Sequence, residues 1–259
     1  MDDVCIDGFS DEKWHQIIRG VNLTLKRGQV LGLIGESGAG KSTLGLAAMG
    51  FSRSGCRISR GSIVFDGVDL VKKSEAFKRS IWGTRICYVA QSAAAAFNPA
   101  HKLIDQTIEA TVRGKIKSVV DAKRDAISLF GSLQLPDADL IGFRYPHQVS
   151  GGQLQRVMTA MAMSTRPDLI IFDEPTTALD VTTQVEVLAA IRSVVEEFNT
   201  AAIYITHDLS VVAQMADIIK VLRYGLEIEE ADTKRMLSKP KDPYTKSLWS
   251  VRALEKKEI

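Results

Sequence analysis

An eight-residue run in the first fifth of the chain is Gly35-Glu36-Ser37-Gly38-Ala39-Gly40-Lys41-Ser42. It matches the pattern G-x-x-x-x-G-K-[ST] at every fixed position. The apolar residues from Val30 to Ile34 precede it and predict a buried strand, and the residues from Thr43 to Met49 predict a helix. A strand, a glycine-rich turn and a helix in this order indicate a phosphate-binding loop, or P-loop.

The composition of this P-loop suits the chemistry of phosphate binding. Glycines let the backbone curl so that successive N–H groups converge on phosphate oxygens. The following helix adds its N-terminal dipole and free amides. We expect Lys41 to bridge the β- and γ-phosphates of a nucleotide and Ser42 to ligate Mg²⁺. The predicted nucleotide-binding residues are Gly35, Glu36, Ser37, Gly38, Ala39, Gly40, Lys41, Ser42 and Thr43. The alternative is an incidental glycine-rich turn, and the P-loop alone leaves kinases, GTPases, helicases and transport ATPases open.

Length and composition narrow the class of protein. The 259 residues suffice for one large α/β domain, and a formal net charge of +2 argues against a nucleic-acid-binding domain with its concentrated basic stripe. Cys5, Cys56 and Cys87 form no C-x-x-C pair, so we expect buried or surface thiols and no zinc or iron–sulfur site. An acidic N-terminus and the lack of any long apolar stretch predict no secretory signal and no membrane span. Any membrane role must then come through a partner.

Short apolar runs alternate with helical patterns along the chain, which predicts parallel strands joined by helices. Further strands are predicted at 169–172, 201–206 and 218–222, and an antiparallel pair at 4–9 and 21–25. Residues 102–133 are expected to be helical, with the basic patch at 113–117 on a solvated helix face. The alternative is that this patch contacts an acidic partner. The predicted fold is therefore α/β: a RecA-like mixed-sheet core with an antiparallel β subdomain and an inserted helical subdomain.

Two carboxylates end the strand predicted at 169–172. Asp173 and Glu174 lie where a doubly wound sheet delivers side chains to its ligand. Asp173 can hold Mg²⁺ through its water shell, and Glu174 can orient and deprotonate the attacking water. The alternative is an acidic pair that merely closes a strand. No N-K-x-D motif for guanine occurs, which counts against a GTPase.

A second glycine pair precedes another predicted helix, in Val149-Ser150-Gly151-Gly152-Gln153. Ser150 suits a helix N-cap, and the glycines leave backbone amides open beside the helix N-terminus. The residues expected to bury this helix are Leu154, Val157, Met158, Met161 and Ala162. Ser150, Gly151, Gly152 and Gln153 therefore predict a second anion site, separate from the P-loop.

This run resembles the L-S-G-G-Q signature of ABC ATPases, with Val149 in place of the leucine. The resemblance implies ATP hydrolysis with Mg²⁺ by two domains paired head-to-tail, each signature covering the γ-phosphate held by the other chain. It also implies roles for residues elsewhere. Gln91 matches the Q-loop glutamine that contacts Mg²⁺ and the water, and Ala178-Leu179-Asp180 matches the D-loop between subunits. His207 matches the switch histidine at the γ-phosphate. Trp14 is the expected adenine-stacking aromatic, with Phe9 as its rival.

Three further stretches resemble the oligopeptide, dipeptide and nickel import ATPases. They are Ala96-Phe97-Asn98-Pro99, the stretch from Glu174 to Thr182, and Asp242-Pro243-Tyr244-Thr245-Lys246. The resemblance implies two homologous ATPases, two permeases and an extracytoplasmic binding protein, with this chain on the cytoplasmic face of the inner membrane and no nucleic-acid partner. Alanines at 93–96 and Asp242 in place of the usual histidine depart from the family pattern. The chain also ends without the cysteine-bearing tail of longer members, so no iron–sulfur site is implied.

The resemblance covers nearly the whole chain and predicts one ABC nucleotide-binding domain. Its expected parts are a core at about 1–91 and 161–230, a helical subdomain at about 92–160, and a C-terminal extension at about 231–259. The alternatives are a soluble ABC ATPase that acts on DNA or ribosomes, and an exporter ATPase. The cargo, whether peptide, nickel or a metal–chelator complex, is not determined by this chain, nor is the choice between homodimer and heterodimer.

Overall fold

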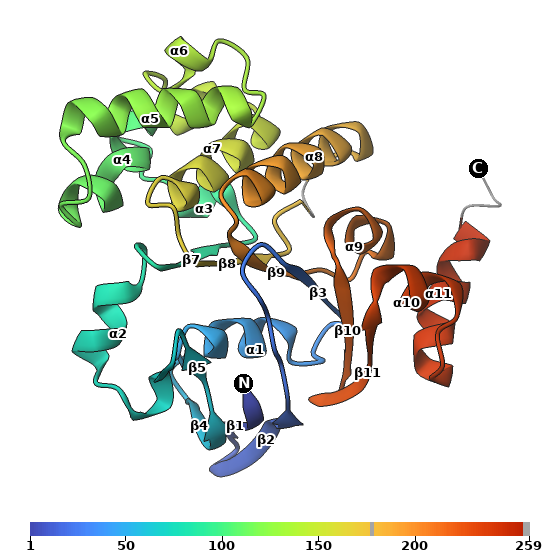
Figure 1. Cartoon of the computed structure of the whole chain (residues 1–259). Helices are drawn as coiled ribbons and strands as arrows, with labels where there is room; N and C mark the ends of the chain where they lie inside the picture. The colour runs from blue at the N-terminus through green and yellow to red at the C-terminus, as the bar shows by residue number, and fades with distance from the viewer. Residues whose placement is uncertain (177–178, 256–259) are drawn as a thin grey trace. The chain divides into compact units, whose positions relative to one another are not determined.

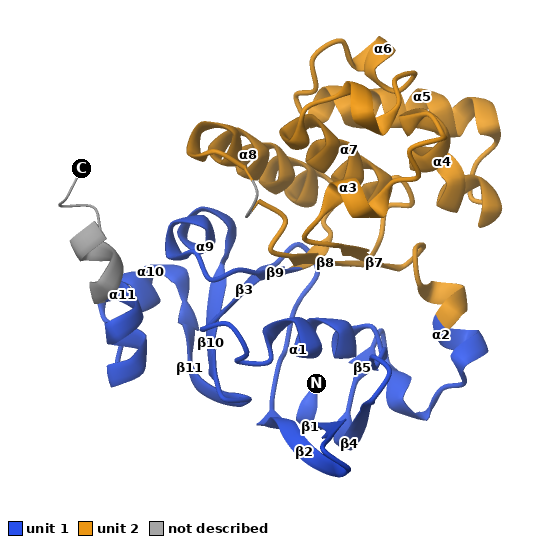
Figure 2. Ribbon diagram, turned by 180° about the vertical axis from the view of Figure 1, so that it is seen from behind, with its two compact units in different colours: residues 1–78, 203–259 blue, residues 79–202 orange. Residues whose placement is uncertain are grey.

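The computed structural model describes residues 1–176 and 179–255. The chain forms two compact units, and Figure 2 colours them separately. Unit 1 comprises residues 1–78 and 203–259, and unit 2 comprises residues 79–202. Among the described residues, no helix combines the length and the apolar character needed to cross a bilayer.

The main sheet of unit 1 has the strand order β11-β10-β3-β9, and β9 spans the boundary between the units. These strands are β3 (Val30–Ile34), β9 (Ala201–Ile205), β10 (Ile218–Arg223) and β11 (Leu226–Asp232). β10 runs parallel to β3 and antiparallel to β11, so the sheet is mixed. Every residue of β3 is buried, as its unbroken apolar sequence predicts. Helix α1 (Lys41–Ala48) follows β3, which confirms the predicted strand–loop–helix order.

A three-stranded antiparallel sheet occupies the N-terminal part of unit 1. Its strands are β1 (Asp2–Ser10), β2 (Lys13–Val21) and β4 (Cys56–Ser62), in the order β2-β1-β4. The prediction of a strand at 21–25 is wrong, because the second strand runs from Lys13 and ends at Val21. The side chain of Asn22 accepts a hydrogen bond from the N–H of Asp3. Beyond this point Met1 and Leu23 still exchange backbone hydrogen bonds of 2.8 and 3.1 Å, but residues 22–25 are not part of the strand.

The remaining short elements of unit 1 connect these sheets or follow them. They are β5 (Val64–Phe65), β6 (Val68–Asp69), the 3-10 helix η1 (Leu70–Lys72), α9 (Leu209–Met215), α10 (Thr233–Ser238) and α11 (Pro243–Glu255). Helix α2 (Glu75–Ile81) spans the boundary between the units. Figure 1 shows α10 and α11 beside β10 and β11. Met236 of α10 and Tyr244 of α11 are buried in one cluster with Ile34, Ile219 and Val221. The C-terminal helices therefore complete the core that supports β3.

Unit 2 contains a parallel strand pair and a group of helices. The strands are β7 (Ile86–Val89) and β8 (Leu169–Asp173). The helices are α3 (Ala93–Ala96), α4 (Leu103–Arg113), α5 (Val119–Ser132), α6 (Ala138–Ile141), the 3-10 helix η2 (Pro146–Gln148), α7 (Gly151–Met163) and α8 (Val181–Glu197). Helices α4 and α5 both pack against α7. Leu154, Val157, Met158 and Ala162 are buried on α7 as predicted, while Met161 is half-buried.

The basic patch at 113–117 is exposed except at the half-buried Lys117, and it does not form a helix face. Arg113 ends α4, and Lys115 has a φ of 54°, so the patch turns between α4 and α5. Arg113 pairs with Glu109 at 2.9 Å and Lys117 pairs with Asp125 at 2.8 Å. Local acidic partners therefore neutralise both of these cations. The expected thiols are also in place: Cys5 and Cys87 are buried and Cys56 is half-buried.

Candidate nucleotide site

The P-loop leaves β3 at Gly35 and enters α1 at Lys41. Residues 36–38 are exposed, whereas the side chain of Lys41 is only 6% exposed. Its ammonium donates hydrogen bonds to Gly35 O at 2.8 Å and to Glu36 O at 2.9 Å. A buried ammonium beneath an exposed glycine-rich loop supplies the positive charge and the amide donors that a polyphosphate requires. The geometry therefore fits the predicted phosphate cradle.

Gly35 has a tertiary reason to be glycine. Its φ is 152°, and a Cβ atom at this position would lie 2.1 Å from the backbone oxygen of Leu222 in β10. Because a backbone oxygen of a buried strand cannot move aside, any side chain here would displace the entry of the P-loop. The first glycine of the motif is thus required by the neighbouring strand as well as by the phosphate.

His207 follows β9, as the sequence predicts, and is exposed. The residue before it is bonded to the strand that leads into the P-loop, because Thr206 N donates to Leu33 O at 3.2 Å. The residue after it caps α9, since the carboxylate of Asp208 accepts from Ser210 N at 2.8 Å. Backbone contacts on both sides therefore hold the position of His207 within unit 1.

The two aromatic candidates for adenine stacking lie side by side. Phe9 and Trp14 are paired across β1 and β2, with ring centroids 5.2 Å apart and rings tilted by 57°. Phe9 is 52% exposed and Trp14 is 44% exposed. The guanidinium of Arg57 lies 4.0 Å from the centroid of the Trp14 ring. The two side chains form one exposed aromatic surface, and the choice between them stays a prediction.

In unit 2, β8 ends at the two predicted carboxylates. Asp173 is 7% exposed, and its Oδ2 accepts a hydrogen bond of 2.5 Å from the hydroxyl of Tyr88. Glu174 has a φ of 49°, a left-handed conformation that costs a non-glycine residue energy. The amide nitrogen of Gln91 lies 3.5 Å from Glu174 Oε2. The structure therefore places Gln91 against Glu174, the residue that directly follows Asp173.

The predicted signature begins a helix, as expected. Ser150 Oγ accepts from Gln153 N at 3.3 Å, and Ser150 N donates to Gln153 Oε1 at 3.0 Å. These reciprocal bonds form a capping box, which confirms Ser150 as the N-cap of α7. Gly151 and Gly152 then form the first turn of that helix.

Asp180 of the predicted D-loop caps α8. Its Oδ1 accepts from Thr183 N at 3.0 Å, and this backbone hydrogen bond lowers the pKa of Asp180. A carboxylate at a helix N-terminus is further stabilised by the helix dipole. Ala178, also assigned to the D-loop, lies outside the described residues together with Thr177.

Sequence reasoning missed two tyrosines at these sites. Tyr88 lies on β7, and its neighbours in the parallel strand pair are apolar. Its hydroxyl, the polar group in an otherwise apolar strand, was the signal that could have identified it. Tyr244 was noted only as part of a C-terminal motif, yet its hydroxyl accepts a hydrogen bond from Glu36 N in the P-loop at 3.2 Å. No local pattern connects residues 208 positions apart.

The fold and the P-loop define a P-loop nucleotide-binding protein. A family model described as ABC transporter matches residues 18–177. The chain belongs to the ABC transporter family, and it is an ATP-binding cassette ATPase. The family resemblance and the fold class predicted from the sequence are thereby confirmed.

Curated relatives extend the similarity along the chain. The oligopeptide transport ATP-binding protein of Lactococcus lactis subsp. cremoris (strain SK11) is 38% identical over 91% of this chain and 70% of the relative. The dipeptide transport ATP-binding protein of Bacillus subtilis (strain 168) is 38% identical over 90% of this chain and 70% of the relative's length. The glutathione import ATP-binding protein of Salmonella typhimurium (strain LT2) is 37% identical over 89% of this chain and 38% of the relative's length.

A solved structure agrees with the fold. It is a dimeric ATP-binding cassette in a post-hydrolysis state, bound to ADP and Pi. Its TM-score is 0.78 at 23% identity, and the match covers 90% of this chain and 97% of that one. The likeness supports the ABC cassette fold with its antiparallel β subdomain and its helical subdomain.

Proposed function

We propose that this chain is the ATP-hydrolysing subunit of an ABC importer that takes up peptides, nickel or a related small solute. The observation that carries the proposal is the 38% identity to an oligopeptide transport ATP-binding protein across 91% of the chain. Relatives named for dipeptide transport and glutathione import support the peptide class of cargo. The chain then works on the cytoplasmic face of the inner membrane, bound there through its partners.

In this proposal the P-loop binds the phosphates of ATP, and Lys41 lies at the β- and γ-phosphates. Mg²⁺ would be held by Ser42, by Gln91 and, through water, by Asp173. Hydroxyl, amide and carboxylate oxygens suit this cation, and the hydroxyl of Tyr88 keeps the buried Asp173 carboxylate oriented. When bound, Mg²⁺ would supply positive charge that neutralises the transferred phosphoryl group.

The remaining residues act on the attacking water, on the γ-phosphate and on the adenine ring. Glu174 orients and deprotonates the water, and its contact with Gln91 holds the carboxylate at the strained end of β8. His207 contacts the γ-phosphate. Trp14 or Phe9 stacks on the adenine, because both rings are exposed in one aromatic surface.

We propose that the active unit is a head-to-tail pair with a second ABC ATPase, either identical or homologous. The signature residues Ser150, Gly151, Gly152 and Gln153 and the D-loop residue Asp180 then contact the nucleotide of the partner. Support comes from the N-terminus of α7, where the cap Ser150 and the following Gly151 are exposed. The dimeric state of solved cassettes with this fold agrees with the pairing.

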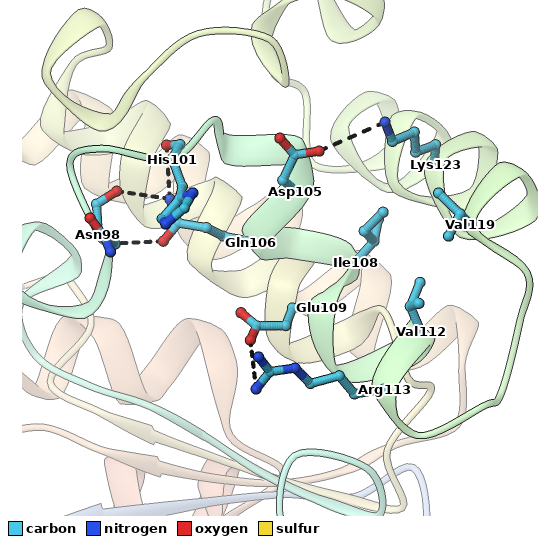
Figure 3. A pocket seen from close by; sticks show the side chains of 10 residues that line it. All are labelled: Asn98, His101, Asp105, Gln106, Ile108, Glu109, Val112, Arg113, Val119 and Lys123. Carbon is cyan, nitrogen blue, oxygen red and sulfur yellow. Dashed lines mark hydrogen bonds and ion pairs between the residues drawn. The ribbon is translucent and has the colours of Figure 1, made fainter.

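The complete importer then contains two permeases and an extracytoplasmic binding protein, and no nucleic acid. A cavity of about 540 Å³ in unit 2 is the proposed permease contact. Figure 3 shows apolar Ile108, Val112 and Val119 between charged groups of α4 and α5. The ion pair of Asp105 with Lys123 spans 3.7 Å at one side. An apolar floor with a charged rim suits an amphipathic helix of a membrane partner.

The whole chain then functions as one nucleotide-binding domain. Its proposed parts are a RecA-like core at about 1–91 and 161–230, a helical subdomain at about 92–160 and a C-terminal extension at about 231–259. The helices α4, α5 and α7 and the capped signature support the helical assignment.

An uptake assay tests the function. A strain that lacks this chain should lose uptake of labelled peptides or of nickel, and the wild-type chain should restore it. The variant Lys41→Ala should not restore uptake, because it lacks the ammonium beneath the P-loop. Unchanged uptake of every tested solute in the deletion strain would contradict the proposal. Restoration by Lys41→Ala would show that transport does not need this ATP site.

A further inference from the structure

One peptide group of the P-loop is held at both of its ends. The carbonyl of Gly35 accepts a hydrogen bond of 2.8 Å from Lys41 Nζ. The N–H of the same peptide group, which belongs to Glu36, donates to the hydroxyl of Tyr244 at 3.2 Å. The groups form a continuous chain from the Tyr244 hydroxyl through one amide to the Lys41 ammonium. Hydrogen bonds in such a chain polarise one another and strengthen together.

We propose that Tyr244 is a positioning residue for nucleotide binding, which sets the place of the Lys41 ammonium by fixing the Gly35–Glu36 peptide group. This inference rests on the proposed function, in which Lys41 binds the β- and γ-phosphates. An unsupported peptide group can rotate, and its carbonyl then no longer directs the ammonium to one place. Tyr244 therefore preorganises the cradle before ATP arrives.

The side chain of Tyr244 is itself held rigidly. It is 6% exposed, and it packs in the cluster that contains Ile34 at the end of β3. The guanidinium of Arg223 lies 4.3 Å from the centroid of its ring. Burial raises the pKa of Tyr244, so the hydroxyl keeps its own proton while it accepts from Glu36.

The start of α11 is anchored by a second set of contacts. The carboxylate of Glu229 in β11 accepts from Lys241 N at 2.9 Å and from Asp242 N at 3.0 Å. Asp242 Oδ1 in turn accepts from Tyr244 N at 2.7 Å. A buried carboxylate that satisfies backbone amides fixes the start of α11 beside β11. The position of the Tyr244 hydroxyl thus depends on the contacts of residues 229–244, and not on Tyr244 alone.

β10 and the turn that follows it approach the P-loop at two other points. The N–H of Gly225, in the turn between β10 and β11, donates to Ala39 O at 3.1 Å. The backbone oxygen of Leu222 in β10 leaves no room for a side chain at Gly35. The P-loop is therefore supported near both of its ends by residues 222–244, and Tyr244 is the one side chain of that segment seen to bond to it among the described residues.

The variant Tyr244→Phe tests the inference, because it removes the hydroxyl and keeps the ring beside Arg223. Binding of Mg-ATP is measured by equilibrium titration. We expect the dissociation constant to rise by about fivefold, the effect of losing one intramolecular hydrogen bond. Tyr224→Phe is the matched control, since Tyr224 is 65% exposed and its ring lies 5.1 Å from the same guanidinium. The control should bind ATP as the wild type does.

A double-mutant cycle separates positioning of Lys41 from general support of the fold. In the Lys41→Ala background, Tyr244→Phe should change ATP affinity by less than about twofold, because the ammonium it positions is gone. An equal loss of affinity in both backgrounds would overturn the inference, as would wild-type affinity in Tyr244→Phe. Failure of the wild-type chain to bind ATP would instead overturn the proposed function.

Hydrogen exchange gives a readout that does not depend on nucleotide. In Tyr244→Phe, amide exchange should quicken in a peptide that covers Gly35 to Lys41 and stay unchanged in β11. The Tyr224→Phe control should leave both regions unchanged. Faster exchange in β11 and α10 without a change in the P-loop would contradict the inference, because it would assign Tyr244 to packing of the C-terminal segment alone.

Discussion

The P-loop and the signature both present glycines and backbone amides, but they are supported in different ways. The P-loop depends on partners far along the chain, since Glu36 bonds to a residue 208 positions away. The signature depends on itself, since Ser150 and Gln153 cap the helix across three positions. An ammonium buried at an exact place needs a rigid tertiary scaffold. A capped helix end needs only a short sequence, so it can be remote from the core.

The largest expected effect is that of replacing Glu174, the proposed base for the attacking water. Glu174→Gln should lower ATP hydrolysis by about 10²-fold or more, because the amide cannot accept the proton of the attacking water. An ATP-bound dimer should accumulate and be visible by size-exclusion chromatography.

Glu197→Gln is the matched control for this variant, because it makes the same change at an exposed residue of α8. It should hydrolyse ATP at the wild-type rate. Brisk turnover by Glu174→Gln would remove Glu174 as the base and weaken the reading of its strained backbone as functional.

A pair of alanine substitutions tests the comparison itself. Gly35→Ala should destabilise the fold by about 2–3 kcal/mol, because its Cβ would lie 2.1 Å from the Leu222 oxygen. Gly151→Ala should change stability by less than about 0.5 kcal/mol, because its Cβ would lie at an ordinary 3.9 Å from the side chain of Leu179. Urea unfolding measures both free energies. Equal losses would show that the two glycine sites do not differ in tertiary support.

Loss of the local cap should have a smaller effect. Ser150→Ala should cost about 1 kcal/mol of unfolding free energy, because the first turn of α7 loses the side chain that accepts from Gln153 N. Ser150→Asn should retain most of that stability, since asparagine is also a good N-cap. If Ser150→Asn were as unstable as Ser150→Ala, helix capping would not explain the contribution of Ser150.

The smallest expected effect is a pH dependence at the C-terminal anchor of the P-loop. Burial opposes ionisation of Glu229, but hydrogen bonds from Asp242 and Lys241 outweigh it and lower its pKa. A lowered folded-state pKa stabilises the fold above the unfolded-state pKa, and this contribution disappears as pH falls through the folded-state pKa.

Wild-type protein should therefore lose a few degrees more of melting temperature than Glu229→Gln when the pH is lowered below about 4. Thermal melts at a series of pH values measure the difference. If the melting temperatures of the two proteins fell equally with pH, ionisation of Glu229 would not contribute to the acid sensitivity of the fold.

Local sequence patterns predicted both helix N-termini and the strand before the P-loop. Val30–Ile34 is apolar throughout, and Ser150 precedes a helical pattern, so neighbouring residues carried the signal. The prediction of a strand at 21–25 is wrong after Val21, where the Asp3 N–H bonds to the side chain of Asn22 before Leu23 and Met1 exchange backbone hydrogen bonds. Such competition between side chain and backbone depends on which segments meet, which periodicity does not report.

The chemistry of the P-loop was present in its own residues: Lys41 supplies the charge and the glycines supply the amides. The orientation of those groups was not, because the Gly35–Glu36 peptide bonds to Tyr244 and the Ala39 carbonyl bonds to Gly225. Residue identity sets which interactions a short segment can make. Only folding decides which of them are made, because it brings the C-terminal hairpin and helix against a loop near the other end of the chain.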